Sequence, residues 1–229
     1  IVYCVLFLQN QPVDFKDLPY LLTFTYNWQL IFGYVPGDDS KWGYFMHLWT
    51  LSVEEQFYLF FPLIALFTPP RFRLTMIIYF IVLGPIIRFA YRENIAVIFD
   101  NPEWSAFSIY AASITHFDAF LSGSLIANLE PYIRRKPKIV KLFWTGAMLS
   151  GTLYVTAYFW INRSLGATGI DAFRGIISGT IYGQYREVFV YMVVDIFVST
   201  LLMQVILQTK LTDFLSIRIL SKIGAMSYG

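Results

Sequence analysis

Long apolar runs separated by short polar segments dominate the chain. Five of these runs are long enough to cross a hydrocarbon layer of about 30 Å, which takes roughly 20 helical residues. They predict membrane-spanning helices at 48–67, 74–91, 107–129, 139–161 and 188–207. The sequence therefore predicts an all-α, polytopic transmembrane helix bundle that forms a single domain over 1–229.

The segments between these runs predict loops and two shorter elements. Residues 18–34 are apolar but short, and Asn27 and Gln29 interrupt them, which predicts a re-entrant or interfacial piece. Residues 210–222 alternate apolar and basic side chains, which is typical of a segment that lies along the membrane surface. Residues 1–8 are interpreted as the end of a further spanning helix. Loops are predicted at 9–17, 92–105, 131–138 and 162–186.

The distribution of charge predicts the orientation of the helices. Cytoplasmic loops of membrane proteins carry an excess of Lys and Arg. Basic residues cluster in alternate connections of this chain, at Arg71, Arg73, Arg134, Arg135, Lys136, Lys138, Lys141, Lys210, Arg218 and Lys222. The opposite connections hold Asp38, Asp39, Glu93, Asp100, Glu103, Asp171 and Glu187. The start of the helix at 48–67, with Glu54, is therefore expected near the outer face.

Composition supports a membrane protein and excludes several other classes. Hydrophobic residues make up 57% of the chain and charged residues 14%, against about 25% charged in soluble domains. The lone Cys4 excludes an internal disulfide, and Cys4, His47 and His116 lack metal-ligand spacing. The sequence also has no Gly-rich phosphate loop and no basic–aromatic nucleic-acid patch. It predicts the lipid bilayer as a partner, with no nucleic acid, no metal and no bound cofactor.

Several ionisable residues lie within the predicted spans. Such residues normally face a bundle interior or a wet cavity and pair with one another. Arg88 could instead snorkel to the headgroups, and His116 could make an interhelical hydrogen bond. Asp118 is too deep to snorkel, which favours a partnered or functional role, and Asp195 is interpreted in the same way.

Two adjacent carboxylates stand at the start of the helix at 48–67. Ser52 with Glu55 three residues on predicts a capping box, which would give Glu55 a structural role. Glu54 has no such role, and it shares a helix face with Tyr58, four residues on. The alternative is that both glutamates are solvated residues at the membrane surface.

The same stretch carries a family resemblance. The run WTLSVEEQFYLFFPL at 49–63 resembles the signature of the membrane acyltransferase-3 family, with Thr50 where Ser is usual. Residues 115–123 are similar to the family's Arg-x-Asp-(x)4-Gly segment, with His116 where Arg is usual. Residues 223–229 are similar to the Gly-x-x-Ser-Tyr that opens a late helix. The three matches occur in the family's order.

The resemblance implies an integral-membrane O-acyltransferase of the cell membrane. Members of this family move an acyl group, usually acetyl, from acyl-CoA to a hydroxyl of a cell-surface glycan or a related, lipid-linked acceptor. Acyl-CoA would then be a donor substrate and not a resident cofactor. With this reaction as the expectation, Glu54 and Tyr58 are the catalytic candidates, and Arg88, His116 and Asp118 are the substrate-binding candidates.

The resemblance also places the family's catalytic His on a first helix that this sequence lacks. The chain opens in mid-hydrophobic run and stops where a helix should begin, so it is predicted to be a fragment that is inactive alone. A transporter or flippase, in which buried charges line a substrate path, is the alternative from another class. The sequence shows no inverted repeat that would favour it. A catalytically inactive homologue is a third possibility, because His116 replaces the usual Arg.

Overall fold

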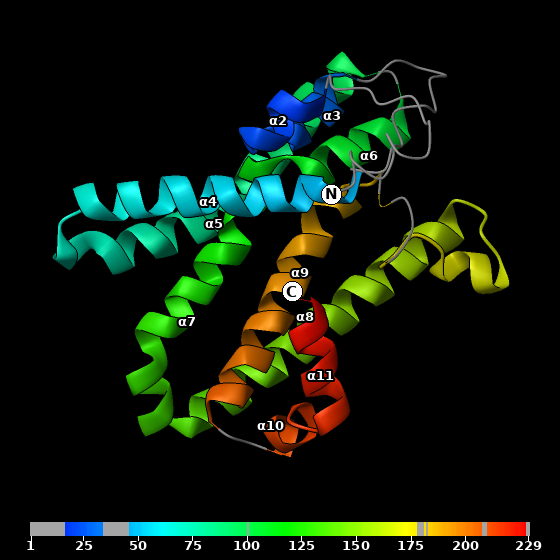
Figure 1. Cartoon of the computed structure of the whole chain (residues 1–229). Helices are drawn as coiled ribbons and strands as arrows, with labels where there is room; N and C mark the ends of the chain where they lie inside the picture. Colours follow the sequence, from blue (N-terminus) through cyan, green and yellow to red (C-terminus); the bar gives the residue numbers. More distant parts are fainter. Residues whose placement is uncertain are drawn as a thin grey trace. The chain divides into compact units, whose positions relative to one another are not determined.

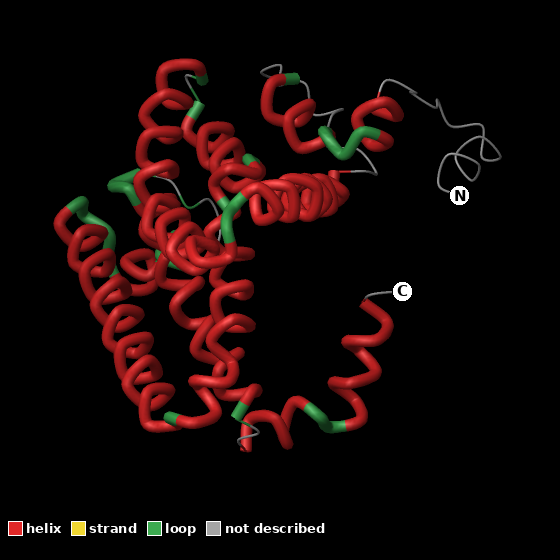
Figure 2. Tube along the Cα trace, turned by 90° about the vertical axis from the view of Figure 1, so that its left-hand side faces the viewer, coloured by secondary structure: helices red, strands yellow, loops and turns green. Residues whose placement is uncertain are grey.

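The structure of the 229-residue chain is a computed structural model. It describes residues 17–33, 46–99, 101–177, 181, 183–207 and 210–227. All regular elements in these residues are α-helices or short 3₁₀ helices (Figures 1 and 2), which confirms the predicted all-α fold. The predicted helix end at 1–8, the predicted loop up to residue 16 and the acidic Asp38 and Asp39 lie outside the described residues.

The helices divide between two compact units. Unit 1 comprises Ile1–Phe67 and Tyr110–Ser113, and unit 2 comprises Thr68–Ile109 and Ile114–Gly229. The described helices of unit 1 are α2 (Leu18–Leu22), α3 (Tyr26–Phe32), η3 (Met46–Leu48) and α4 (Trp49–Phe67). Those of unit 2 are α5 (Pro70–Ile98), α7 (Phe117–Arg135), α8 (Pro137–Ser164), η5 (Gly169–Phe173), α9 (Arg186–Ile206), α10 (Lys210–Leu215) and α11 (Arg218–Ser227). The segments α6 (Pro102–Ala111) and η4 (Ser113–Thr115) pass from one unit to the other.

In unit 1, the described part of the predicted re-entrant or interfacial piece forms two short helices. α2 has 5 residues and α3 has 7, so neither is long enough to span a membrane. Between them the chain turns at Phe24, whose φ is 53°. α3 packs against α4 and buries Tyr26, Asn27 and Ile31. The amide of Asn27 is thus a buried polar group that needs partners in the fold.

The predicted capping box of Ser52 and Glu55 at the start of α4 is wrong. The helix begins at Trp49, directly after the 3₁₀ turn of η3, so the chain is already wound before Ser52 is reached. Ser52 is buried inside the helix, and its Oγ donates to the Leu48 carbonyl at 3.5 Å. Glu55 is therefore the seventh residue of α4 and lies too far from the N-terminus for a capping box. Burial of Trp49, together with Ser52 and Val53 on one face, moves the helix start upstream.

In unit 2, α9 packs against α5, α7 and α8, and α5 packs against α7 (Figure 1). Near the C-terminal end of α9, Met203 packs with buried residues of α7 and α8, namely Ile126, Ile133 and Val140. Towards the N-terminal end, Val190 packs with Tyr154, Tyr158 and Ile176. The buried Arg186 and Glu187 lie at this second end of α9.

The predicted span at 107–129 is interrupted, and the predicted loop at 92–105 is largely helical. α5 continues to Ile98, α6 ends at Ala111, and α7 begins only at Phe117. A break at this depth leaves carbonyl groups without helical partners, and side chains must satisfy them. Asn27 Nδ2 donates to the Ala111 carbonyl at 3.0 Å. Long-range partners of this kind are invisible in the apolar pattern of 107–129.

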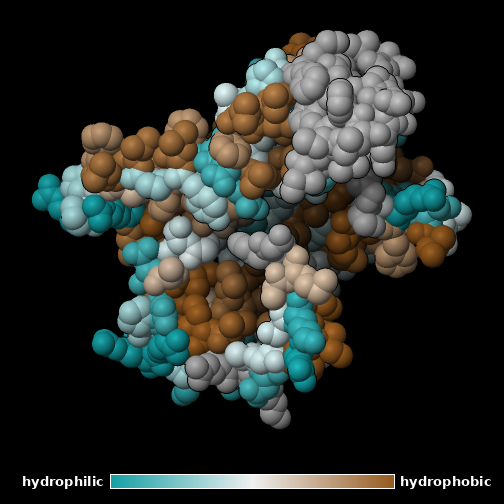
Figure 3. Space-filling view, viewed as in Figure 1, coloured by the Kyte–Doolittle hydropathy of each residue, from teal (hydrophilic) through white to brown (hydrophobic). Residues whose placement is uncertain are grey.

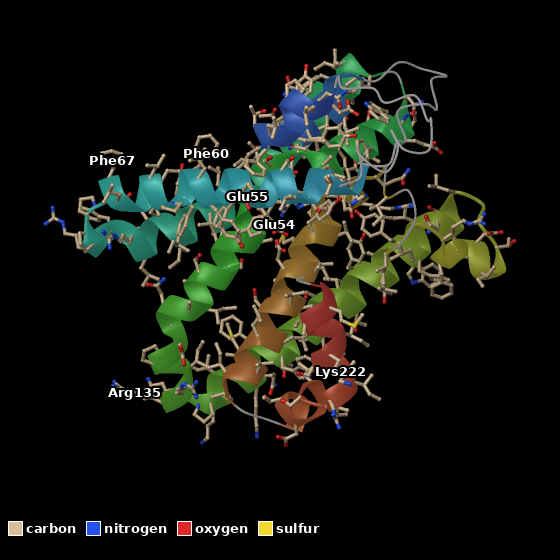
Figure 4. The ribbon with its side chains drawn as sticks, viewed as in Figure 1. Glu54, Glu55, Phe60, Phe67, Arg135 and Lys222 are labelled. Carbon is tan, nitrogen blue, oxygen red and sulfur yellow. The ribbon has the colours of Figure 1, made fainter. Side chains whose placement is uncertain are left out.

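The predicted basic loop at 131–138 is a tight turn. α7 runs to Arg135 and α8 starts at Pro137, so Lys136 alone connects them. Proline at the first helical position is favourable, and Arg in the last turn complements the helix dipole. The basic residues predicted to mark the cytoplasmic side therefore lie at helix ends. Figure 3 shows hydrophilic surface in this part of the molecule, and Figure 4 labels Arg135 there.

Among the described helices, α4, α5 and α9 are long and apolar enough to cross a membrane. Large apolar side chains on α9, such as Phe189, Val194 and Phe197, are exposed, which suits contact with lipid. α7 and α8 have 19 and 28 residues but fall short of the same apolarity. The apolar helices support a membrane protein, and the predicted order of membrane crossings stays a prediction.

Candidate functional site

A buried ion pair joins α5 and α7 in unit 2. Arg88 is 0% exposed and Asp118 is 5% exposed. Arg88 Nη1 donates to Asp118 Oδ1 at 2.9 Å, and Nη2 lies 2.7 Å from Asp118 Oδ2. Nη1 also donates to the Thr115 carbonyl at 2.8 Å. The geometry is the two-pronged pairing that suits guanidinium and carboxylate, and it confirms the expectation that Asp118 is partnered.

A glycine makes this pair possible. Gly84 lies one helical turn before Arg88 on α5, so both positions face α7. A Cβ at position 84 would come within 2.5 Å of Asp118 Cγ and 2.7 Å of its Cβ. No side chain fits in that space without displacing the carboxylate. Gly84 thus brings the first turn of α7 against α5, with Asp118 beside the guanidinium.

The break between α6 and α7 supplies a further acceptor for the guanidinium. Thr115 is fully buried, and its Oγ1 donates to the Ile109 carbonyl at 2.6 Å. This bond closes the turn before α7 and leaves the Thr115 carbonyl as an acceptor for Arg88. Arg88 therefore recognises a backbone carbonyl as well as a carboxylate. The snorkelling alternative for Arg88 is excluded, because its charged end is buried inside the unit.

The helix α9 also contributes a side chain beside Arg88. The Tyr191 ring centre lies 5.5 Å from the guanidinium carbon of Arg88, within the range of a cation–π interaction. His116, the residue before α7, meets the same ring edge-on with a centroid distance of 5.1 Å. The structure therefore brings three predicted site residues, Arg88, His116 and Asp118, into one cluster. His116 and Arg88 thus both contact the Tyr191 ring.

A second charged pair joins α5 and α9, one turn further along α5 than Arg88. Arg92 Nε donates to Glu187 Oε1 at 2.9 Å, and Glu187 is 1% exposed. Arg92 also pairs with Glu93 at 2.6 Å and lies over the Tyr185 ring at 4.5 Å. The sequence predicts Glu187 in an outer loop, whereas Glu187 is the second residue of α9. Negative charge is favourable in the first turn of a helix, which was the available signal.

The start of α9 is tied to α8 by a network of hydrogen bonds to neutral groups. Arg186 Nη2 donates to Asn162 Oδ1 and, at 3.0 Å, to Gln184 Oε1. Its guanidinium carbon lies 5.4 Å from the Tyr158 ring centre. Asn162 Nδ2 donates in turn to the Ala172 carbonyl at 2.7 Å. These bonds hold α8, η5 and α9 together, so they give Arg186 and Asn162 a structural role.

In unit 1, the residue of the signature run with the most partners is Gln56. Its Nε2 donates to the Phe24 carbonyl at 2.6 Å and to Asn27 Oδ1 at 2.9 Å. Its Oε1 accepts from Trp28 Nε1 at 3.2 Å and from Ser113 Oγ at 2.6 Å. One amide thus holds α3 and the 110–113 segment to α4. The sequence pattern does not reveal these partners of Gln56, although an amide in an apolar helix needs them.

The two predicted catalytic residues are also on α4, in unit 1. Glu54 is partly buried and Tyr58 is 54% exposed. Among the residues that the structure describes, neither Glu54 nor Glu55 has a hydrogen-bond or ion-pair partner, and Figure 4 shows both side chains on α4. Arg88, His116 and Asp118 belong to unit 2. The catalytic roles of Glu54 and Tyr58 stay predictions.

Comparison with known proteins decides the family. A family model described as an acyltransferase domain matches residues 1–229. The chain belongs to the acyltransferase-3 family. It is also 30% identical over 130 residues to an uncharacterized protein of Haemophilus influenzae, a match that covers 52% of this chain and 49% of that relative. No solved structure matches the chain.

The family match confirms the family that the signature run predicted. In this chain, Gln56 of the 49–63 run joins the helices of unit 1, whereas Glu54 and Glu55 have no hydrogen-bond or ion-pair partner among the described residues. The 115–123 segment supplies Thr115, His116 and Asp118 around Arg88. Arg88 itself lies outside every stretch that resembled the family in the sequence, and only the fold brings it to Asp118. No group of three His, Cys, Asp or Glu in the described ranges could hold a metal ion.

Proposed function

We propose that this protein is an integral-membrane O-acyltransferase that moves an acyl group, usually acetyl, from acyl-CoA to a hydroxyl of an extracytoplasmic glycan or lipid-linked acceptor. The observation that carries the proposal is the acyltransferase family match over the whole chain. The apolar helices α4, α5 and α9 support a reaction at the membrane. The buried charge cluster in unit 2 supports a polar binding site among the helices of that unit.

The reaction makes two demands on such a site. The acceptor oxygen attacks the thioester carbonyl, the C–S bond breaks, and the hydroxyl proton ends on the CoA thiol. A base must take that proton on the way, and hydrogen-bond donors must stabilise the oxyanion of the tetrahedral intermediate. An Arg side chain with a free N–H is a suitable donor for an oxygen that becomes negative.

Arg88 has the features of that donor. Asp118 and the Thr115 carbonyl engage its Nη atoms and hold the guanidinium plane in place. Its Nε has no acceptor among the residues that the structure describes. In the proposed site, Nε donates to an oxygen of the acceptor or of the intermediate, while Asp118 positions Arg88. His116 and Tyr191 form the aromatic wall beside it.

Glu54 and Tyr58 are proposed to act at the outer mouth of the protein. Glu54 is a carboxylate on an apolar helix without a partner in the described residues, so it is available to a substrate. Tyr58 lies one turn further along the same face. In this proposal, Glu54 accepts a hydrogen bond at the outer mouth, and Tyr58 lies beside it.

The test measures acyl transfer in membranes that carry the intact protein. The probes are acetyl-CoA labelled in the acetyl group and the envelope glycan extracted from the host cells, and alkali-labile label on the glycan is the product. We expect transfer above that of membranes without the protein. We expect Arg88→Gln to reduce it on the order of 10²-fold, as removal of one oxyanion donor does. No transfer by the wild type to glycan or to lipid-linked glycan would refute the proposed function.

A further inference from the structure

The face of α9 that meets α5 carries three polar side chains one turn apart: Glu187, Tyr191 and Asp195. The first two have partners on α5. Glu187 accepts from Arg92, and the Tyr191 ring lies beside Arg88. Asp195 continues the series by one more turn. It is partly buried, and it has no hydrogen bond or ion pair within the described parts of the chain.

Asp195 lies within electrostatic range of both members of the buried pair, Arg88 and Asp118. Both Nη atoms of Arg88 are directed at Asp118, and the Thr115 carbonyl takes a further bond from Nη1. Nη1 thus has both of its hydrogens engaged, and Arg88 forms no hydrogen bond with Asp195 among the described residues. With both carboxylates ionised, these three charged groups carry a net charge of −1.

A carboxylate without a partner is costly to place within a membrane-spanning helix, so such a residue usually has a functional role. Asp195 is nine residues from the start of α9, or about 13 Å along the helix axis. Its short side chain is too far from the helix end to reach the headgroups, and its neighbours Val194 and Ile196 offer no polar partner. Ionisable residues at such positions in membrane proteins mark binding sites and transfer paths. A hydrogen-bond donor from outside the protein would complete the group.

We infer that Asp195 is an acceptor-binding residue, whose carboxylate takes a hydrogen bond from a hydroxyl of the acyl acceptor next to Arg88. The inference rests on the proposed function, because a hydroxyl-bearing acceptor is the ligand. A hydroxyl supplies the donor that Asp195 lacks, and its oxygen is then free to accept from Arg88 Nε. The two side chains together would hold the hydroxyl by both its proton and its lone pair.

The experiment uses Asp195→Asn in the intact protein, with labelled acetyl-CoA and the extracted envelope glycan as probes. Asn keeps the shape but loses the charge, and a hydrogen bond to a charged group is roughly twice as strong as a neutral one. We expect the KM for the glycan to rise about tenfold and the KM for acetyl-CoA to stay within about twofold. The control is Glu130→Gln, which removes an exposed carboxylate paired with Arg134 on α7, and both of its KM values should be unchanged.

The outcomes separate this inference from the proposed function. A wild type that transfers no label overturns both. If the wild type is active and Asp195→Asn leaves the glycan KM unchanged, only the inference is overturned. A decrease in kcat alone, or a rise in KM for both substrates, indicates a structural role and also overturns the inference. Acyl transfer is also measured in sodium and in choline buffers. A wild type that depends on sodium, with an Asp195→Asn variant that does not, would show that Asp195 binds a cation and would also overturn the inference. If Asp195→Asn accumulates poorly in the membrane, Asp195→Ser is measured against the same expectation.

Discussion

Gly84 on α5 lies directly against Asp118 on α7, and a Cβ at position 84 would meet the carboxylate at less than van der Waals distance. The contact explains how two helices that are separated in sequence by α6 hold a guanidinium and a carboxylate together in a two-pronged pair. The same pair is the centre of the proposed acceptor site. A substitution at Gly84 therefore tests the geometry without removing either charge.

Gly84→Ala should destabilise the protein even though Ala is the better helix former. The methyl group must displace Asp118, and overpacking of this kind costs about 1–3 kcal/mol. We expect a lower melting temperature in detergent and a loss of acyl transfer. Gly151→Ala on α8 is the matched control, because a Cβ there meets nothing within 4 Å, and it should be neutral or stabilising. Equal behaviour of the two variants would show that the contact does not constrain the pair.

Glu54→Gln tests the predicted catalytic role on α4. If Glu54 interacts with the reacting groups, loss of its charge should reduce transfer on the order of 10²-fold. Insertion should be unchanged, because a neutral side chain is cheaper to place in a membrane. Glu55→Gln is the control, about 100° away around the helix, and should cost little. Acyl transfer rates equal to the wild type in Glu54→Gln would remove Glu54 from the mechanism.

Gln56→Leu should destabilise the protein through unit 1. The substitution leaves the Phe24 carbonyl and the side chains of Asn27, Trp28 and Ser113 without their shared partner. Each unsatisfied buried group costs about 1–3 kcal/mol, so the melting temperature and the amount in the membrane should both fall. Leu59→Ala, an exposed change on the same helix, is the control. A Gln56→Leu variant as stable as Leu59→Ala would contradict the network.

His116→Arg tests the departure from the family pattern. A second guanidinium beside Tyr191 would find a cluster with two carboxylates, Asp118 and Asp195, and one cation. We therefore expect less than about a tenfold loss of acyl transfer, which is below about 1.4 kcal/mol of transition-state stabilisation. Amount in the membrane is the control measurement. A larger loss at normal amounts would show that the imidazole itself is needed for this substrate.

Apolar length and the signature motif are local properties of the chain, so the sequence by itself determined α4, α9 and the family. The run from Leu48 to Phe67 predicted α4 to within one residue of its ends, and the run at 188–207 predicted α9 to within two. A continuous run of about 20 apolar residues has few alternatives to a helix in a membrane. The signature run in α4 likewise indicated the family that the whole chain matches.

The tertiary structure decided where helices break and which charges meet. The run at 107–129 has the apolar pattern of one span, yet it breaks because Asn27 and Arg88 satisfy the freed carbonyls of Ala111 and Thr115. The capping box at Ser52 was wrong because burial of Trp49 extends α4 upstream. Hydrogen bonds and ion pairs between residues tens of positions apart depend on packing, which a pattern along the chain does not contain. The pairing of Arg88 with Asp118 and the unpaired state of Asp195 within the described residues result from that packing alone.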